Sequence, residues 1–190
     1  MRKIMYAMSV SLDGFIEATD GDLNWTNPDE ELHKHFNDLG SAIATVLYGR
    51  RMYENMAAYW PTIDENASEP KHVREYARIW KNRPKVVFSK TLAHVAWNSR
   101  LVSGNIAEEV NKLKEQPGKY MSVSGSGIAS TFMQLGLIDE YRLYLRPVIL
   151  GGGKPMFRQL RDRVNLQLVE TRTFGSGVVL LRYQRADEHH

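Results

Sequence analysis

The sequence predicts one mixed α/β domain, in which strands and helices alternate before the chain ends in antiparallel strands. Up to about residue 136, short apolar runs recur between helix start signals and the glycines that end helices. Beyond that point two long strand-like runs, Val164–Phe174 and Val178–Arg185, flank Gly175–Ser176–Gly177, which is a hairpin signature. With 190 residues and 43% hydrophobic content, the chain is long enough for one domain with a full core but short for two domains. We expect a single domain over residues 1–188, with His189–His190 as a tag remnant.

The composition argues against several classes of protein. The formal net charge of +3 is small and acidic residues are interleaved with basic ones, which argues against a nucleic-acid partner. The absence of cysteine excludes disulfides, thiolate metal sites and a cysteine nucleophile. No apolar run approaches the roughly 18 residues that a membrane helix needs, and the segment after Met1–Arg2–Lys3 is too short for a secretion signal. We therefore expect a soluble cytoplasmic protein without a membrane partner.

The amino-terminal part predicts two strands around one helix. Residues 4–10 are almost wholly apolar, as in a central strand buried on both faces. Asn27–Pro28 predicts the N-cap and first position of a helix, and Glu30 completes a capping-box pattern. Gly40 ends that helix, and residues 42–48 form the next strand.

The same signals predict the remaining elements. The expected helices cover residues 51–59, 73–80, 106–113 and 128–135. The expected strands before the hairpin cover residues 85–88, 101–102, 120–123 and 141–150.

Three of these strands end in residues suited to phosphate. The apolar runs give way to Gly49–Arg50–Arg51, Ser89–Lys90–Thr91 and Ser124–Gly125–Ser126–Gly127. In open α/β sheets ligands bind at the carboxyl ends of strands, so three such ends can meet on one extended ligand. The sequence therefore indicates a phosphorylated dinucleotide.

Each of the three turns also has an ordinary interpretation. Ser124–Gly127 would direct backbone N–H groups and a helix dipole toward a pyrophosphate. Ser130 replaces the third glycine of the dinucleotide fingerprint, however, so an ordinary β–α turn is the alternative interpretation. Arg50 and Arg51 oppose the dipole of the helix they begin, which favours a bound anion over a solvated helix start. Ser89–Lys90–Thr91 suits a ribose 2′-phosphate and is also typical of a surface turn.

Acidic residues gather near the outlet of the first strand, at Asp13, Asp29, Glu30 and Glu31. The helix start alone explains Asp29 and Glu30, because carboxylates favour the first turn. The histidines show no metal-ligand spacing, so we expect no metal site.

Four segments fall in the order of a known family pattern: SLDGFI at 11–16, GRRMYE at 49–54, VFSKTL at 87–92, and LIDEY at 137–141 followed by PVILGGG at 147–153. Over residues 2–185 the chain resembles the dihydrofolate-reductase-like proteins related to the C-terminal reductase domain of the bifunctional riboflavin-biosynthesis deaminase–reductase. The resemblance implies a three-layer α/β/α fold with a mixed, mostly parallel eight-stranded sheet and antiparallel C-terminal strands. It also implies NADPH as cofactor, a small-molecule substrate and a homodimer.

The resemblance assigns cofactor contacts to the strand ends. The implied residues are Gly49, Arg50, Arg51, Ser89, Lys90 and Thr91 for the adenosine and 2′-phosphate, Ser124, Gly125, Ser126, Gly127 and Ile128 for the pyrophosphate, and Ser9 and Ile16 beside the nicotinamide.

On the substrate side, Trp25 and Pro28 match the pattern that precedes a single acid in dihydrofolate reductases. Counting forward from Pro28 selects Glu30, whereas counting back from the next leucine selects Glu31. Arg146 stands where those enzymes have a pocket threonine, and an arginine there favours an anionic or strongly polar substrate over folate.

These features predict an NADPH-dependent reductase of a small carbonyl, imine or heterocycle. Glu30 or Glu31, or Asp13 through water, would supply the proton as catalytic acid. The alternative is a non-catalytic NADP-binding protein that acts as a dimeric sensor or scaffold.

The apolar C-terminal strands also bear on assembly. A single sheet that ends in such strands leaves an exposed edge or an exposed apolar face. Two-fold pairing commonly covers such a surface, although the domain's own helices are an alternative cover. We expect a homodimer built mainly from the C-terminal third.

Overall fold

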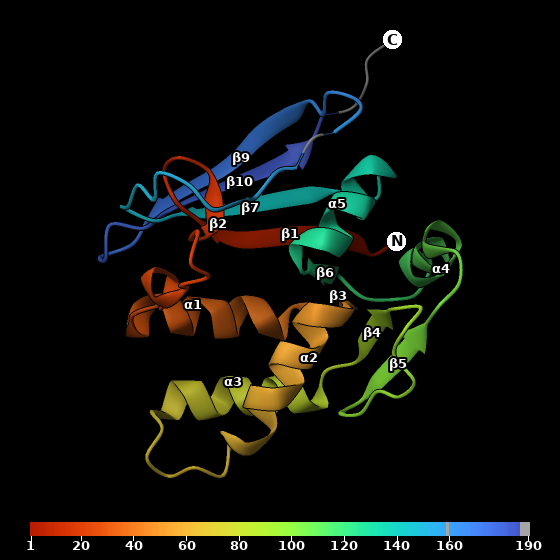
Figure 1. Ribbon diagram of the computed structural model, residues 1–190, viewed down its shortest axis with the longest axis horizontal. Helices are drawn as coiled ribbons and strands as arrows, with labels where there is room; N and C mark the ends of the chain where they lie inside the picture. Colours follow the sequence, from red (N-terminus) through yellow and green to blue (C-terminus); the bar gives the residue numbers. More distant parts are fainter. Residues whose placement is uncertain (159, 187–190) are drawn as a thin grey trace.

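An eight-stranded sheet organises the computed structural model, which describes residues 1–158 and 160–186 (Figure 1). In sheet order the strands are β5 (Ser99–Val102), β4 (Lys85–Phe88), β3 (Ile43–Gly49), β6 (Tyr120–Ser124), β1 (Lys3–Val10), β7 (Glu140–Leu145), β10 (Val179–Arg185) and β9 (Leu166–Thr173). The strands from β5 to β7 are parallel, β10 is antiparallel to β7, and β9 is antiparallel to β10. This arrangement confirms the predicted fold class.

Helices cover both faces of the sheet, which gives three layers (Figure 1). They are α1 (Glu30–Ser41), α2 (Arg50–Tyr59), α3 (Lys71–Asn82), α4 (Ile106–Lys114) and α5 (Ser126–Gln134), with short 3-10 turns η1 (Asn24–Thr26) and η2 (Trp60–Thr62). One core lies between α4, α5 and the sheet, and it includes Tyr6, Val123 and Phe132. The opposite face packs against α1 through Leu32 and against α2 through Tyr53. None of the helices in the described ranges is both long and apolar enough to cross a membrane.

β1 has different lengths of pairing on its two sides. It pairs with β6 from Lys3 to Tyr6, and with β7 from Met5 to Val10. The last four residues of β1 therefore run beside β7 alone, while β6 ends and turns into α5. This divergence opens the sheet at the carboxyl ends of its central strands.

The first helix begins later than the sequence predicted. Its N-cap is Asp29, whose Oδ1 accepts the Leu32 N–H at 2.8 Å, and Glu30 is its first residue. Asn27 instead closes η1, because its N–H donates to the Asn24 carbonyl at 3.1 Å. The prediction of Asn27–Pro28 as the helix start was wrong because a second capping residue lies two positions further on.

The strand predicted over residues 141–150 is also shorter than expected, since β7 ends at Leu145. Arg146 still donates its N–H to the Val10 carbonyl at 2.8 Å, but Pro147 has no N–H to continue the ladder. The chain then turns, and Lys154–Pro155 (β8) pairs with Phe15–Glu17 (β2) in a separate two-stranded sheet. The connection that follows β1 is thereby attached to the connection that follows β7.

The C-terminal hairpin is confirmed. β9 and β10 flank a turn in which Gly177, at φ +83°, donates its N–H to the Phe174 carbonyl. β9 is an edge strand, and Leu168 and Val169 are 49% and 45% exposed. The predicted tag remnant, His189–His190, lies outside the described residues.

Two half-buried histidines on α1, His33 and His35, lie in surroundings that disfavour their protonation. Burial lowers the pKa of His35, whose Nε2 lies 2.9 Å from the Tyr144 hydroxyl, and the positive charge of Arg172 lowers it further. Burial likewise lowers the pKa of His33, whose ring lies 4.7 Å from that of His72. The folded chain therefore binds protons less readily at these rings than the unfolded chain, whose histidines titrate near pH 6.5.

We predict that the free energy of unfolding falls as the pH falls below about 6.5, because the unfolded state then binds more protons than the folded state. Urea unfolding at pH 7.5 and 5.5 measures this difference. The double variant His33→Gln, His35→Gln should show a smaller loss between the two values. An equal loss in both proteins would contradict the assignment to these rings.

Candidate functional site

The carboxyl ends of the parallel strands form one edge of the molecule. Register pairs Gly49 with Phe88, Tyr48 with Ser124, and Val10 with Leu145 at this edge. The three predicted phosphate-binding turns follow directly from β3, β4 and β6, which are neighbours in the sheet. The fold therefore brings these turns together.

The turns after β3 and β6 approach each other closely at two glycines. A Cβ on Gly125 would lie 3.2 Å from Met52 Cβ, and one on Gly49 would lie 3.3 Å from Ile128 Cβ. Gly125 has φ +111°, a conformation that other residues rarely adopt. Only glycine allows the two turns to pack this closely.

These glycines are also the N-caps of α2 and α5, and neither helix has a side-chain cap. The first N–H groups of both helices thus lack the side-chain oxygen that caps α1. Backbone N–H groups and two positive dipole ends face the same edge of the sheet. A Cβ at either glycine would meet the protein's own side chains, so the packing of the turns requires the glycines, and the uncapped N–H groups are the part that could bind a phosphate.

The side chains around Arg50 form the second part of the site. Arg50 Nη1 donates to Thr91 Oγ1 at 2.8 Å, and its Nε lies 3.1 Å from Glu54 Oε1. Ser89 Oγ accepts the N–H groups of Thr91 and Leu92, so it shapes the turn after β4. The structure thus joins the turn after β3 to the turn after β4.

Arg51 and Lys90 are exposed and lie beside this contact in the chain. With Arg50 they make the rim of the site cationic. These are the charges that could meet a 2′-phosphate.

Arg146 lies at the other end of the same edge, directly after β7, and only 5% of it is exposed. Its guanidinium donates to Ser9 Oγ and to the carbonyl oxygens of Thr26 and Asn27. Burial lowers the pKa of Arg146, and the charge of Asp29 opposes that shift. The predicted residues Ser9 and Arg146 are therefore in direct contact.

Two of the predicted acids are bound to other segments of the chain. Asp13 accepts hydrogen bonds from Ser11 Oγ at 2.7 Å and from the N–H groups of Leu150 and Gly151. The Ser11 bond is the largest cause that holds the pKa of Asp13 below its usual value. Glu31 accepts the Gly175 N–H at 3.0 Å. Both carboxylates fasten loops, which is a poor state for a proton donor.

The remaining acids on α1 differ in where they lie. Glu30 is exposed at the first position of the helix. Asp29 caps the helix and is near enough to Arg146 to affect the pKa of that residue. In the sequence the helix start alone accounts for Asp29, whereas its effect on Arg146, 117 positions away, is visible only in the folded molecule.

Trp25 and Ile16 complete the predicted set. Trp25 lies half-buried in η1, and its Nε1 donates to the Asp22 carbonyl at 3.1 Å. Ile16, in β2, is 6% exposed and packs in the core that contains Val10. Ile16 is therefore a core residue that packs near the end of β1, and little of its side chain is open to the site.

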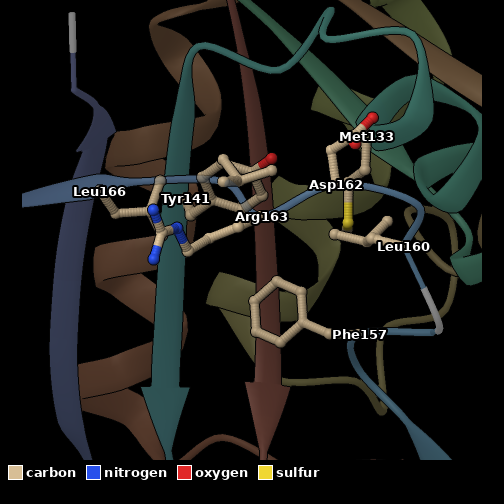
Figure 2. Close-up of a pocket in the computed structure, with 8 residues that line it drawn as sticks. Met133, Tyr141, Phe157, Leu160, Asp162, Arg163 and Leu166 are labelled. Carbon is tan, nitrogen blue, oxygen red and sulfur yellow. The ribbon is translucent and has the colours of Figure 1, made fainter. Parts of the chain in front are cut away.

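A separate pocket of about 250 Å³ lies away from this edge (Figure 2). Figure 2 shows its side chains, which come from the end of α5, from β7 and β9, and from the connection before β9; they include Met133, Tyr141, Phe157 and Leu166. Tyr141 is the second residue of β7, whereas Arg146 follows its last. The pocket is thus at the opposite end of that strand. Within the described residues no group of three His, Asp or Glu side chains could hold a metal ion.

Comparisons with known proteins identify the family of the chain. Residues 2–180 match the family model described as the RibD C-terminal domain. The chain is 39% identical over 183 residues to the uncharacterized protein YyaP of Bacillus subtilis (strain 168), covering 96% of this chain and 94% of that one.

Two solved structures share the fold. A candidate riboflavin-biosynthesis protein from Shewanella sp. PV-4 has a TM-score of 0.77 and 20% identity, covering 97% of this chain and 99% of that one. A dihydrofolate reductase from Enterococcus faecalis in complex with NADP(H) has a TM-score of 0.63 and 16% identity, covering 97% of each chain.

We predict effects of different size for alanine at Gly125 and at Gly127. Gly125→Ala should destabilise the fold by about 1–3 kcal/mol, because φ is positive and Met52 Cβ lies 3.2 Å from the new atom. Gly127→Ala should change stability by less than about 1 kcal/mol, since the added Cβ would meet no atom within 4 Å outside its chain neighbours and its own helix backbone. Urea unfolding of both variants measures this. Equal stability of the two would contradict the close approach at Gly125.

Proposed function

Because the chain belongs to the RibD C-terminal domain family, we propose that it is a reductase that uses NADPH to reduce a small carbonyl, imine or heterocyclic compound. The observation that carries the proposal is the pair of glycine N-caps, Gly49 and Gly125, at adjacent strand ends. Their helices offer uncapped N–H groups to one pyrophosphate. NADPH would supply the hydride, and the protein supplies placement and electrostatics.

The cationic rim supports NADPH over NADH. Arg50, Arg51 and Lys90 would bind the 2′-phosphate, with the Thr91 hydroxyl held beside it by its bond to Arg50. Ser124, Ser126, Gly127 and Ile128 would surround the pyrophosphate from the β6–α5 turn. Ser9 would border the nicotinamide, at the end of β1 where β6 has already turned away.

On the substrate side, we place the proton donor on the first turn of α1. Glu30 is the candidate, because it is exposed at the first position of the helix, whereas Asp29 accepts the Leu32 N–H as the N-cap. The positive charge of Arg146 favours a substrate that carries or develops negative charge. The bonds that occupy Asp13 and Glu31 favour the alternative, a non-catalytic NADP-binding sensor.

NADPH oxidation followed at 340 nm across a panel of carbonyls, imines and pyrimidinones tests turnover and separates these two functions. Loss of absorbance with one class of acceptor supports the reductase. Tight NADPH binding without oxidation by any acceptor supports the sensor.

We predict that NADPH binds at least about tenfold more tightly than NADH, because charge-assisted bonds to a phosphate contribute about 1.5–3 kcal/mol each. The double variant Arg50→Ala, Lys90→Ala should remove this difference. Lys112→Ala, which breaks an exposed pair with Glu108 on α4, is the matched control and should keep it. Isothermal titration calorimetry that gives equal affinities for the unmodified protein would refute the phosphate assignment.

The C-terminal third also supports our proposal of a homodimer. Phe157, Leu168 and Val169 are each more than 40% exposed, and β9 is an unpaired edge. A second copy would cover both features, since a two-fold axis brings the same patch of each chain together.

Light scattering should therefore return about twice the chain mass of 21.8 kDa at micromolar concentration. Leu168→Lys should shift the protein toward the monomer by placing a charge in the interface. A Leu135→Lys variant, at an exposed site after α5, is the control and should leave the mass unchanged. A mass of one chain for the unmodified protein would exclude the dimer.

A further inference from the structure

Arg146 is a buried arginine whose donors are almost fully committed within the protein. Nε and Nη2 donate to Ser9 Oγ at 3.3 and 3.1 Å. Nη2 also donates to the Thr26 carbonyl at 2.6 Å, and Nη1 donates to the Asn27 carbonyl at 3.3 Å. A guanidinium has five N–H groups, so these four bonds leave one. Little of its hydrogen-bonding capacity remains for a ligand.

These bonds join three segments that are far apart in the sequence. Ser9 belongs to the end of β1, Arg146 follows β7, and Thr26 and Asn27 form the end of η1 and the start of the connection to α1. The Arg146 N–H also donates to the Val10 carbonyl at 2.8 Å. One side chain therefore fastens the loop before α1 to the strand ends.

The loop has few other long-range hydrogen bonds. Among the described residues, every other hydrogen bond of residues 23–27 joins positions at most three apart, such as Thr26 N–H to the Leu23 carbonyl and Trp25 Nε1 to the Asp22 carbonyl. Local bonds of this kind shape a turn but do not fix its place on the protein. Arg146 supplies the hydrogen bonds that do.

The acceptors explain why the residue is an arginine. They are two carbonyls and a hydroxyl rather than a carboxylate, so the contacts depend on the directions of the donors and not on an ion pair. The planar fork reaches Thr26 and Asn27 from one side and Ser9 from the other. A lysine ammonium carries the same charge, but its donors radiate from a single atom.

We infer that Arg146 is a positioning residue for the substrate side of the site, which holds residues 23–27, and with them Trp25, against the ends of β1 and β7. This role replaces the sequence-based expectation that Arg146 grips an anionic substrate directly. The inference rests on the proposed function only in that this loop borders the substrate.

Hydrogen exchange of the full-length protein, read by mass spectrometry, tests the inference without any turnover. Exchange in residues 22–28 should accelerate at least about tenfold in Arg146→Met and in Arg146→Lys, because neither side chain reproduces the fork. Ser9→Ala keeps both bonds to the loop and removes only the side-chain contact of Arg146 with β1, so its exchange should rise less than that of either Arg146 variant. Amides of the β9–β10 hairpin should not change in any variant.

The Arg146→Lys variant distinguishes an effect of the donor geometry of arginine from an effect of its positive charge. If Lys restores the unmodified exchange in residues 22–28, charge alone suffices and the positioning role is wrong. The same conclusion follows if Arg146→Met leaves the loop protected, or if exchange rises equally in the hairpin. Because Lys keeps the charge in a side chain of similar length, it provides the test if Arg146→Met does not fold.

Binding and kinetics give a second readout. NADPH affinity should stay within about twofold in Arg146→Lys, because the pyrophosphate turn lies on other strands, whereas the KM of an accepted substrate should rise at least about tenfold. An unchanged KM with accelerated exchange would show that the loop does not serve the substrate and would overturn the inference. Failure of the unmodified protein to bind NADPH would refute the proposed function, and the exchange result would still decide the role of Arg146 in holding the loop.

Discussion

The divergence of β1 from β6 is the constraint on which the site depends. Up to Tyr6 the two strands are paired, and beyond it β1 continues along β7 while β6 turns into α5 at Gly125. Gly125 takes a positive φ at that turn, and α5 starts beside Gly49 at the end of β3. A longer β6 would close the sheet and bury the helix end that the proposed pyrophosphate needs.

The arginines on and next to β7 and β10 have two different kinds of hydrogen-bond partner. Arg142 and Arg182 both bind the fully buried Glu140, at 2.6 and 3.0 Å. Burial opposes the ionisation of Glu140, but the bonds from these arginines outweigh it and keep its pKa below the usual value. Arg182 also pairs with Glu170 at 3.1 Å, so two carboxylates balance the two arginines. Arg146, by contrast, donates its side-chain hydrogen bonds to neutral oxygens, and the charge that acts on it is that of Asp29.

Local signals made most of the fold predictable. Glycines, capping residues and apolar periodicity located the strands and helices, and Gly175–Ser176–Gly177 located the hairpin. The errors have local causes too. Asp29 displaced Asn27 as the N-cap, and Pro147 ended β7 early. Where two capping residues or a proline compete with a longer pattern, the hydrogen bonds of the folded chain decide the boundary.

The site was less predictable, because it depends on contacts between distant positions. The turns after β3, β4 and β6 could be foreseen, since the ends of neighbouring parallel strands share an edge. Nothing local indicates that Asp13 would bind residues 150–151, that Glu31 would bind Gly175, or that Arg146 would hold the loop before α1. Each of those bonds joins residues more than 100 positions apart. Sequence reasoning could name these side chains but not their partners.

A titration of the ¹⁵N-labelled protein with NADPH, followed by amide chemical shifts, tests the central claim most directly. We expect the largest shifts at Gly49, Arg50, Thr91 and Gly125–Ile128, where the two uncapped helices and the cationic rim meet. The amides around Met133, Tyr141 and Leu166 should be unaffected. Shifts confined to that second pocket, or none at all at millimolar NADPH, would contradict a cofactor site at the carboxyl ends of the strands.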